Sequence, residues 1–167
     1  RKLYPFGHLT YDLISPFVGD DTIYDVASIT KSIPTASLAL ALIDKGALSL
    51  DKPVATYIPE VKNNYGDSVL VRHLLTYTID SAPLSEMKRR RAEDILSFVF
   101  SRPLEHAPGT VFRYSNTPAL LLGFIVERIF GIGIPQAAQD TFFRPLKMLR
   151  TGFMPLKKLH QYIAPSE

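Results

Sequence analysis

Residues 25–46 limit what this chain can fold into more than any other stretch. They read Asp-Val-Ala-Ser-Ile-Thr-Lys, followed by a run rich in Ala, Leu and Ile that ends at Gly46. The pattern predicts a buried helix that begins near Ser28 and ends at Gly46, because a glycine in the left-handed conformation commonly closes a helix. Pro34 removes one backbone hydrogen bond inside that helix, so we expect its first turns to be irregular and bent.

Ser28 and Lys31 are three positions apart, nearly one helical turn, so both side chains would project from the same face. A serine hydroxyl becomes a good nucleophile when a neighbour takes its proton, and a partly buried lysine with a lowered pKa can do so. The N–H groups at a helix start also favour the negative oxygen that forms when a carbonyl is attacked. The alternative is that Ser28 is only a helix N-cap and Lys31 a solvent-exposed lysine.

The same Ser-x-x-Lys spacing occurs a second time, at 85–88, and sequence context separates the two matches. The second match runs directly into arginines 89–91, a charge cluster typical of a solvated face. The first is followed by the long apolar run, which would bury the stem of Lys31. Only the first match is therefore a candidate for chemistry.

The composition excludes several classes of site and partner. The 167 residues are 46% hydrophobic, enough for the core of one domain or of a large part of a bigger one. The net charge of +3 and the scattered basic residues give no case for a nucleic-acid partner. There are no cysteines, and the four histidines lie far apart without metal-ligand spacing, so we expect no disulfide and no metal site. The apolar runs are too short or too interrupted to span a bilayer.

The rest of the chain is predicted to be mostly helical, with a little strand at the front. Aromatic and β-branched residues over 3–14 favour an edge-type strand, since Pro5 and Gly7 argue against a central one. His73 falls on a short predicted helix and is interpreted as structural rather than catalytic. The expected helices cover a brief turn or helix from 51 to about 59, and then 69–76, 92–101, 117–130 and 135–143.

Tyr114-Ser115-Asn116 follows the Ser-x-x-Lys pair some eighty residues later, in a loop before a predicted helix. Together the two motifs resemble the serine β-lactamase and penicillin-binding-protein superfamily. The chain is most similar to the branch that holds class C β-lactamases, D-alanyl-D-alanine carboxypeptidases and related esterases. Further segments resemble family landmarks in family order, so that the resemblance spans roughly residues 20–155: 44–54, 57–60, 71–76, 108–110 and 144–148.

The resemblance implies a role for four side chains. Ser28 would be the acylated nucleophile, and Lys31 would help to activate it. The Tyr114 hydroxyl would act as the base in acylation and pass the proton to the leaving group, provided that nearby cations lower its pKa well below the usual value of about 10. Asn116 would hold the amide carbonyl of the substrate. On the local pattern alone, Tyr114 could instead be an ordinary aromatic at the edge of the core, and Asn116 a turn or cap residue.

The chain departs from the family pattern in two places. Family members carry a third element, Lys-Thr-Gly or His-x-Gly, on a strand that also supplies the second N–H of the oxyanion hole, and we find none here. Arg150-Thr151-Gly152 has a sequence similar to Lys-Thr-Gly, but we assign it no catalytic role. The family often has His-Thr-Ser-Gly after Thr76, whereas this chain has Tyr-Thr-Ile-Asp at 77–80. Because the chain opens on Arg1 and stops where much of the sheet should follow, we expect a fragment or a truncated relative.

The predicted fold class is therefore α+β, of the β-lactamase/transpeptidase-like type. We expect mostly its helical part, with a few N-terminal strands and without the C-terminal part of the sheet. The expected layout is a single partial domain: strands in 1–26, a helical region in 27–155 that carries both motifs, and a truncated tail in 156–167.

The resemblance implies a serine hydrolase that works through an acyl-enzyme on an ester, an amide or a β-lactam, without a cofactor or a metal. Its relatives commonly act outside the bacterial cytoplasm. Loss of one oxyanion-hole donor typically lowers the rate by about 10² to 10³, so the chain alone is expected to turn over poorly. The alternative is a non-catalytic, penicillin-recognising module that binds or assembles. We also expect self-association through exposed sheet edges.

Overall fold

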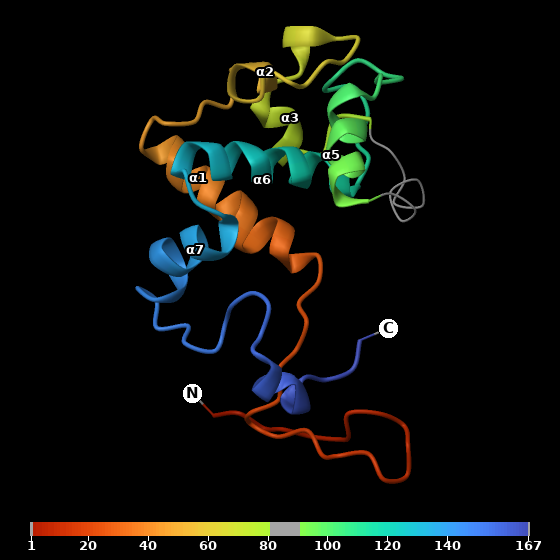
Figure 1. Cartoon of the computed structure of the whole chain (residues 1–167), viewed down its shortest axis with the longest axis vertical. Helices are drawn as coiled ribbons and strands as arrows, with labels where there is room; N and C mark the ends of the chain where they lie inside the picture. Colours follow the sequence, from red (N-terminus) through yellow and green to blue (C-terminus); the bar gives the residue numbers. More distant parts are fainter. Residues whose placement is uncertain (1, 81–90, 167) are drawn as a thin grey trace.

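The computed structural model describes residues 2–80 and 91–166, and helices dominate it (Figure 1). The second Ser-x-x-Lys match at 85–88 and arginines 89 and 90 lie outside the described residues. The helical elements, with η for 3₁₀ or π turns, are η1 Lys31–Ala36, α1 Ser37–Asp44, α2 Val54–Tyr57, η2 Gly66–Ser68, α3 Val71–Leu75, α5 Ala92–Ser101, α6 Asn116–Phe130, α7 Ile134–Ala138, η3 Gln139–Phe143 and η4 Lys157–Tyr162.

Helix α6 organises the packing, because α1, η1, α3 and α7 all contact it (Figure 1). It begins after Ser115, whose backbone is extended, and Pro118 stands in its first turn, where the missing N–H costs no helical hydrogen bond. It ends at Gly131, which has φ +69 and donates its N–H to the Glu127 carbonyl at 2.8 Å. The expected helices over 92–101 and 117–130 are confirmed.

Most of the side chains that α6 buries are aliphatic and join those of its neighbours in one core. Burial of such side chains is the main favourable contribution to folding. The large side chains that are fully buried are Leu38, Ile58, Leu74, Ile125, Val54, Val71, Val126 and Pro118.

The helix that carries Lys31 is irregular, as Pro34 predicts. Pro34 lies inside η1, and Ile33 before it leaves the helical region with φ −124 and ψ 110. Regular α-helix resumes only in α1 and closes at Gly46, which has φ +70. The bend separates the turn around Ser28 from the straight buried part of the helix, so the candidate nucleophile lies at the end of the element.

The expected N-terminal strands in 1–26 are reduced to isolated β-bridges. His8 pairs antiparallel with Phe17, Ile23 pairs in parallel with Ile163, and no regular strand forms in residues 2–80 or 91–166. A two-stranded hairpin without a third strand or a helix across its face is marginal, and Pro5 cannot donate to a ladder. The Ile23–Ile163 bridge brings the two ends of the chain together at one side of the molecule (Figure 1).

No single helix in the described parts of the chain has the length and apolar composition needed to cross a membrane. Asn116–Phe130 and Ile134–Phe143 together have the length and apolar composition of a membrane span, but they form a bent pair with an angle of 73° between its halves.

Candidate active site

Ser28 lies in the turn that leads into the irregular helix, and Lys31 reaches back to it. The Nζ of Lys31 donates a hydrogen bond to the Oγ of Ser28 at 2.7 Å, and the Lys31 N–H donates to the Ser28 carbonyl at 3.0 Å. The helical spacing therefore places both side chains on one face. An ammonium group in this position orients the serine oxygen and favours loss of its proton.

The backbone just before Ser28 is strained. Ala27 has φ +42, in the left-handed region that costs an alanine about 1–3 kcal/mol. The Oδ1 of Asp25 accepts a hydrogen bond from the Ala27 N–H at 2.7 Å and closes a turn there. Asp25 thus holds the turn that precedes Ser28. A sharp, strained turn immediately before a serine presents its hydroxyl outward, which suits a nucleophile.

Tyr114 completes a triangle of polar groups with Ser28 and Lys31. Its hydroxyl is hydrogen-bonded to Ser28, and the Nζ of Lys31 lies 5.6 Å from the centre of its ring. The hydrogen bond with Ser28 has the largest effect and lowers the pKa of Tyr114; burial opposes it, and the charge and hydrogen bonding of Lys31 then lower the pKa further. The direction is the one that a proton-accepting tyrosine requires.

Tyr77 is a fourth side chain at this place, and no role was predicted for it. Its ring lies 5.2 Å from that of Tyr114 at an angle of 30°, and its carbonyl accepts the Arg113 N–H at 2.9 Å. Burial, followed by the neighbouring Tyr114, raises the pKa of Tyr77, so this phenol stays neutral. Its φ of +55 is unusual for an aromatic residue. The only signal in the sequence was the departure from the family pattern that begins at this position.

These groups border a hollow of about 410 Å³. Ser28, Lys31 and Tyr114 supply its polar side, and most of its remaining wall is apolar. An open, mostly apolar hollow with a few convergent polar groups suits an organic acyl compound. The other lining residues are Ile29, Ser32, Ala36, Leu74, Leu75, Tyr77, Ala119 and Leu122.

Two other predicted positions lie outside this hollow. Asn116 is the first residue of α6, two positions after Tyr114, and it is not among the described residues that line the hollow. Arg150-Thr151-Gly152 lines a separate hollow beside the N-terminal and C-terminal segments. The Nη1 of Arg150 donates to the Asp20 carbonyl there at 2.8 Å. The structure therefore groups three of the four predicted site residues. The Arg-Thr-Gly sequence at 150–152 lies apart from them.

His73 has a structural position. Its Nδ1 accepts the backbone N–H of Leu70 at 3.1 Å, which satisfies a donor at the start of α3. Burial, followed by the charge of Arg72, lowers the pKa of His73, so the ring is neutral and can accept that bond. A Cβ added to Gly109 would lie 3.3 Å from the Nε2 of His73, so the ring also packs against the loop that leads to Tyr114.

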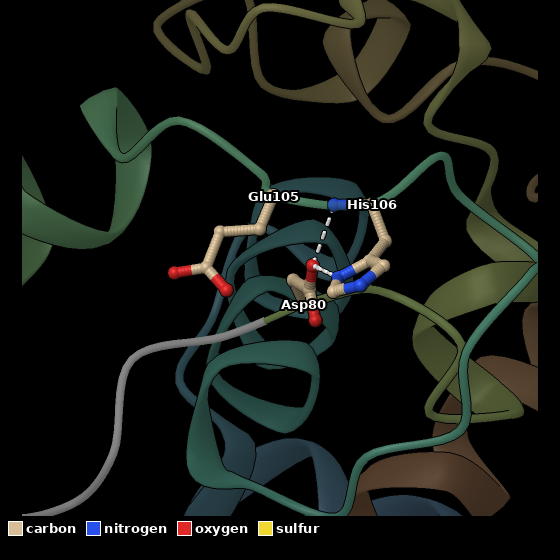
Figure 2. A group of neighbouring side chains, drawn as sticks. All are labelled: Asp80, Glu105 and His106. Atoms are coloured by element: carbon tan, nitrogen blue, oxygen red, sulfur yellow. Dashed lines mark hydrogen bonds and ion pairs between the residues drawn. The ribbon is translucent and has the colours of Figure 1, made fainter.

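Asp80 forms a polar cluster with Glu105 and His106, which lie at the start of that loop (Figure 2). Each offers one possible metal-binding atom, and these atoms lie within 4.8 Å of one another. However, the Oδ2 of Asp80 accepts hydrogen bonds from both the backbone N–H and the Nδ1 of His106, each 2.6 Å long. Because these bonds already use the carboxylate oxygen and the ring nitrogen that face each other, the geometry describes an anchor between two loops rather than a metal centre.

The pKa of Asp80 reflects this anchor. Burial acts to raise it, but the hydrogen bonds from His106 and the charge of Arg113 outweigh burial, so the pKa of Asp80 is lowered. The Nη1 of Arg113 lies 3.6 Å from Oδ1. The carboxylate is therefore ionised and can only accept hydrogen bonds, so the proton of the shared bond belongs to His106.

Known proteins match this chain in sequence and in fold. The family described as Beta-lactamase matches residues 15–164. A protein described as "Putative D-alanyl-D-alanine carboxypeptidase" from Escherichia coli (strain K12) is 30% identical over 152 residues, covering 82% of this chain and 35% of that protein. "Protein flp" from Staphylococcus aureus (strain MW2) is 31% identical over 141 residues, covering 79% and 28%. The chain thus spans about a third of the length of the curated relatives that it matches.

Solved structures show the same relationship. The crystal structure of a class C beta lactamase superposes with a TM-score of 0.84 at 25% identity, covering 96% of this chain and 45% of that chain. A D-stereospecific amidohydrolase from Streptomyces sp. superposes with a TM-score of 0.67 at 27% identity, covering 78% and 44%. The predicted fold class is confirmed: a β-lactamase-like fold, mostly its helical part.

Proposed function

Because this chain belongs to the beta-lactamase family, a family of serine hydrolases, we propose that Ser28 is its nucleophile and forms an acyl-enzyme. The observation that carries the proposal is the contact between three groups, in which the Oγ of Ser28 is hydrogen-bonded to both Lys31 and Tyr114. A serine between an ammonium group and a phenol of lowered pKa has both an orienting cation and a base. The substrate class is an ester, an amide or a β-lactam.

The proposed reaction is acyl transfer to water. The Tyr114 phenolate takes the proton of Ser28 as Oγ bonds to the substrate carbonyl carbon. The tetrahedral intermediate then collapses, the bond to the leaving amine or alcohol breaks, and Tyr114 returns the proton to that group. Water attacks the resulting ester in the reverse sense and releases the acid and free Ser28. Asn116 would orient the amide of a substrate from the start of α6.

Covalent labelling tests this proposal. The purified chain is incubated separately with a fluorophosphonate and a penicillin, and its intact mass is measured. We expect one adduct per chain, mapping to Ser28 and absent in Ser28→Ala. Ser32→Ala is the matched control, because Ser32 borders the same hollow but its hydroxyl donates to the Ile29 carbonyl at 3.3 Å, and it should label normally.

The outcomes separate two functions. An adduct that survives in Ser28→Ala, or that maps elsewhere, would contradict the proposal. Reversible penicillin binding by calorimetry with no adduct on a folded sample would favour the second candidate, a penicillin-recognising module without turnover.

A further inference from the structure

We propose that Asp80 is a positioning residue that holds Tyr114 in place beside Ser28. The inference rests on the proposed function and adds a residue that lies outside the hollow. Its basis is a set of contacts through which the segment 77–80 fixes the segment 106–114.

The Asp80 side chain is almost completely buried. Only 5% of it is exposed. A buried carboxylate is costly unless charged or hydrogen-bonding partners compensate it. Asp80 has such partners in His106 and Arg113, which stand at the two ends of the segment that precedes Tyr114. One carboxylate therefore contacts both ends of that segment, and Figure 2 shows its contact with His106.

Segments 77–80 and 106–114 are also joined by backbone hydrogen bonds. The Thr78 carbonyl accepts the Gly109 N–H at 2.7 Å, and the Tyr77 carbonyl accepts the Arg113 N–H at 2.9 Å. The Tyr77 ring then packs on the Tyr114 ring. Residues 77–80 therefore determine the position of residues 106–114. Tyr77, at one end of segment 77–80, borders the hollow, and Asp80, at the other end, makes the contacts with His106.

Asp80 also lies near the start of the helix that follows Tyr114. The Oδ1 of Asp80 and the Oγ1 of Thr117 are both buried without a hydrogen-bond partner among the described residues. Both residues line one small cavity of about 20 Å³ beside the first turn of α6. A carboxylate at that place also interacts favourably with the positive end of the helix dipole. Asp80 therefore contacts the loop before Tyr114 and borders, through the shared cavity, the first turn of the helix after it.

The central test asks whether Asp80 acts through Tyr114. Asp80→Asn keeps the size of the side chain but removes its charge and one acceptor. We expect the maximal rate of Ser28 labelling by penicillin to fall about 10- to 100-fold, because small displacements of a catalytic group have effects of this size. The penicillin concentration that gives half-maximal labelling should change little. In a Tyr114→Phe background, Asp80→Asn should have no further effect, because the two residues act as one unit.

A second measurement does not depend on activity. Tyrosinate absorbance is titrated with pH, and the difference between wild type and Tyr114→Phe gives the titration of Tyr114 alone. In Asp80→Asn, this titration should move up toward the ordinary tyrosine value of about 10. Asp140→Asn is the matched control, since it removes the carboxylate of an Asp–Arg pair, with Arg144, that lies outside the site. Arg113→Gln, at a half-exposed position, should act in the same direction if Asp80→Asn does not fold.

The proposal is overturned if Asp80→Asn slows labelling as much with Phe at 114 as with Tyr, or if the Tyr114 titration is unchanged in a folded variant. Failure of the proposed function would look different. Wild type would not label at Ser28 at all, while the titration would still report whether Asp80 positions Tyr114.

Discussion

The hydroxyl of Tyr114 meets a serine oxygen and lies close to a lysine ammonium, and this environment should appear in the pH dependence of acylation. Its pKa is lowered, first by the hydrogen bond with Ser28 and then by Lys31. Because the phenolate is the form that accepts a proton, the rate of Ser28 labelling should increase with pH and level off above that lowered pKa. The proportion of phenolate, not the fold, sets this rise.

Replacing Tyr114 by Phe should therefore remove the rise with pH and lower the labelling rate about 10²- to 10⁴-fold, the usual contribution of a positioned base. The measurement is the rate of adduct formation by mass spectrometry across the pH range in which the fold is stable. Tyr11→Phe is the control, because Tyr11 is fully exposed in the N-terminal segment. A Tyr114→Phe variant with the wild-type profile would assign the base to another group.

At the scale of elements, α6 positions Asn116 and ends in a way that can be tested. Gly131 has φ +69, and a Cβ added there meets no atom within 4 Å. Gly131→Ala should therefore lower the free energy of unfolding through backbone strain alone, by about 1–2 kcal/mol. Gly152→Ala is the control, since its backbone is not left-handed and its added Cβ would meet only the flexible end of Gln139 at 3.4 Å. Urea unfolding measures both, and equal effects would contradict the strain argument.

The sequence predicted the helices better than the strands, for a physical reason. Caps, prolines and apolar spacing are local signals, and they located α5 and α6 to within about two residues. A strand depends on a partner that may lie anywhere in the chain. The stretch 3–14 has strand-like residues but only the short His8–Phe17 pairing, so it remains irregular.

In the candidate site too, residues in local motifs could be predicted and residues that act through distant contacts could not. Ser28, Lys31 and Tyr114 belong to short motifs that can be recognised without a structure. Tyr77 and Asp80 matter through contacts with the segment 106–114, and Asp80 is 26 positions from His106. No local pattern reports such a contact. Asp80 was therefore visible only as a departure from the family pattern, without a role.

At the scale of the whole molecule, the N-terminal segment exposes an apolar surface, so the isolated chain should self-associate. Leu13 is 103% and Ile14 is 95% exposed, and several aromatic side chains accompany them. Contiguous apolar surface of this kind is rarely left uncovered in a monomer. The described residues offer isolated bridges rather than a sheet edge, so we expect association through side chains. The accompanying aromatic residues are Tyr4, Phe6, Tyr11 and Phe17.

Light scattering after size-exclusion chromatography measures this association. The apparent mass should rise with protein concentration, and the double variant Leu13→Glu/Ile14→Glu should shift it toward the monomer. Leu40→Glu places the same charge at an exposed leucine of α1 and should leave the mass unchanged. A monomer at every concentration would contradict the prediction.

The bridge between Ile23 and Ile163 also bears on how the protein is made. Ile23 lies between the Tyr162 carbonyl, which accepts its N–H at 2.7 Å, and the Ala164 N–H, which donates to its carbonyl at 2.8 Å. These partners are synthesised 140 residues later, which at about 5–20 residues per second takes roughly 7 to 28 s on the ribosome. During that time the N–H and the carbonyl of Ile23 lack the partners that they have in the folded chain. The pairing between the two ends can therefore form only late in synthesis, after residues 162–164 have been made.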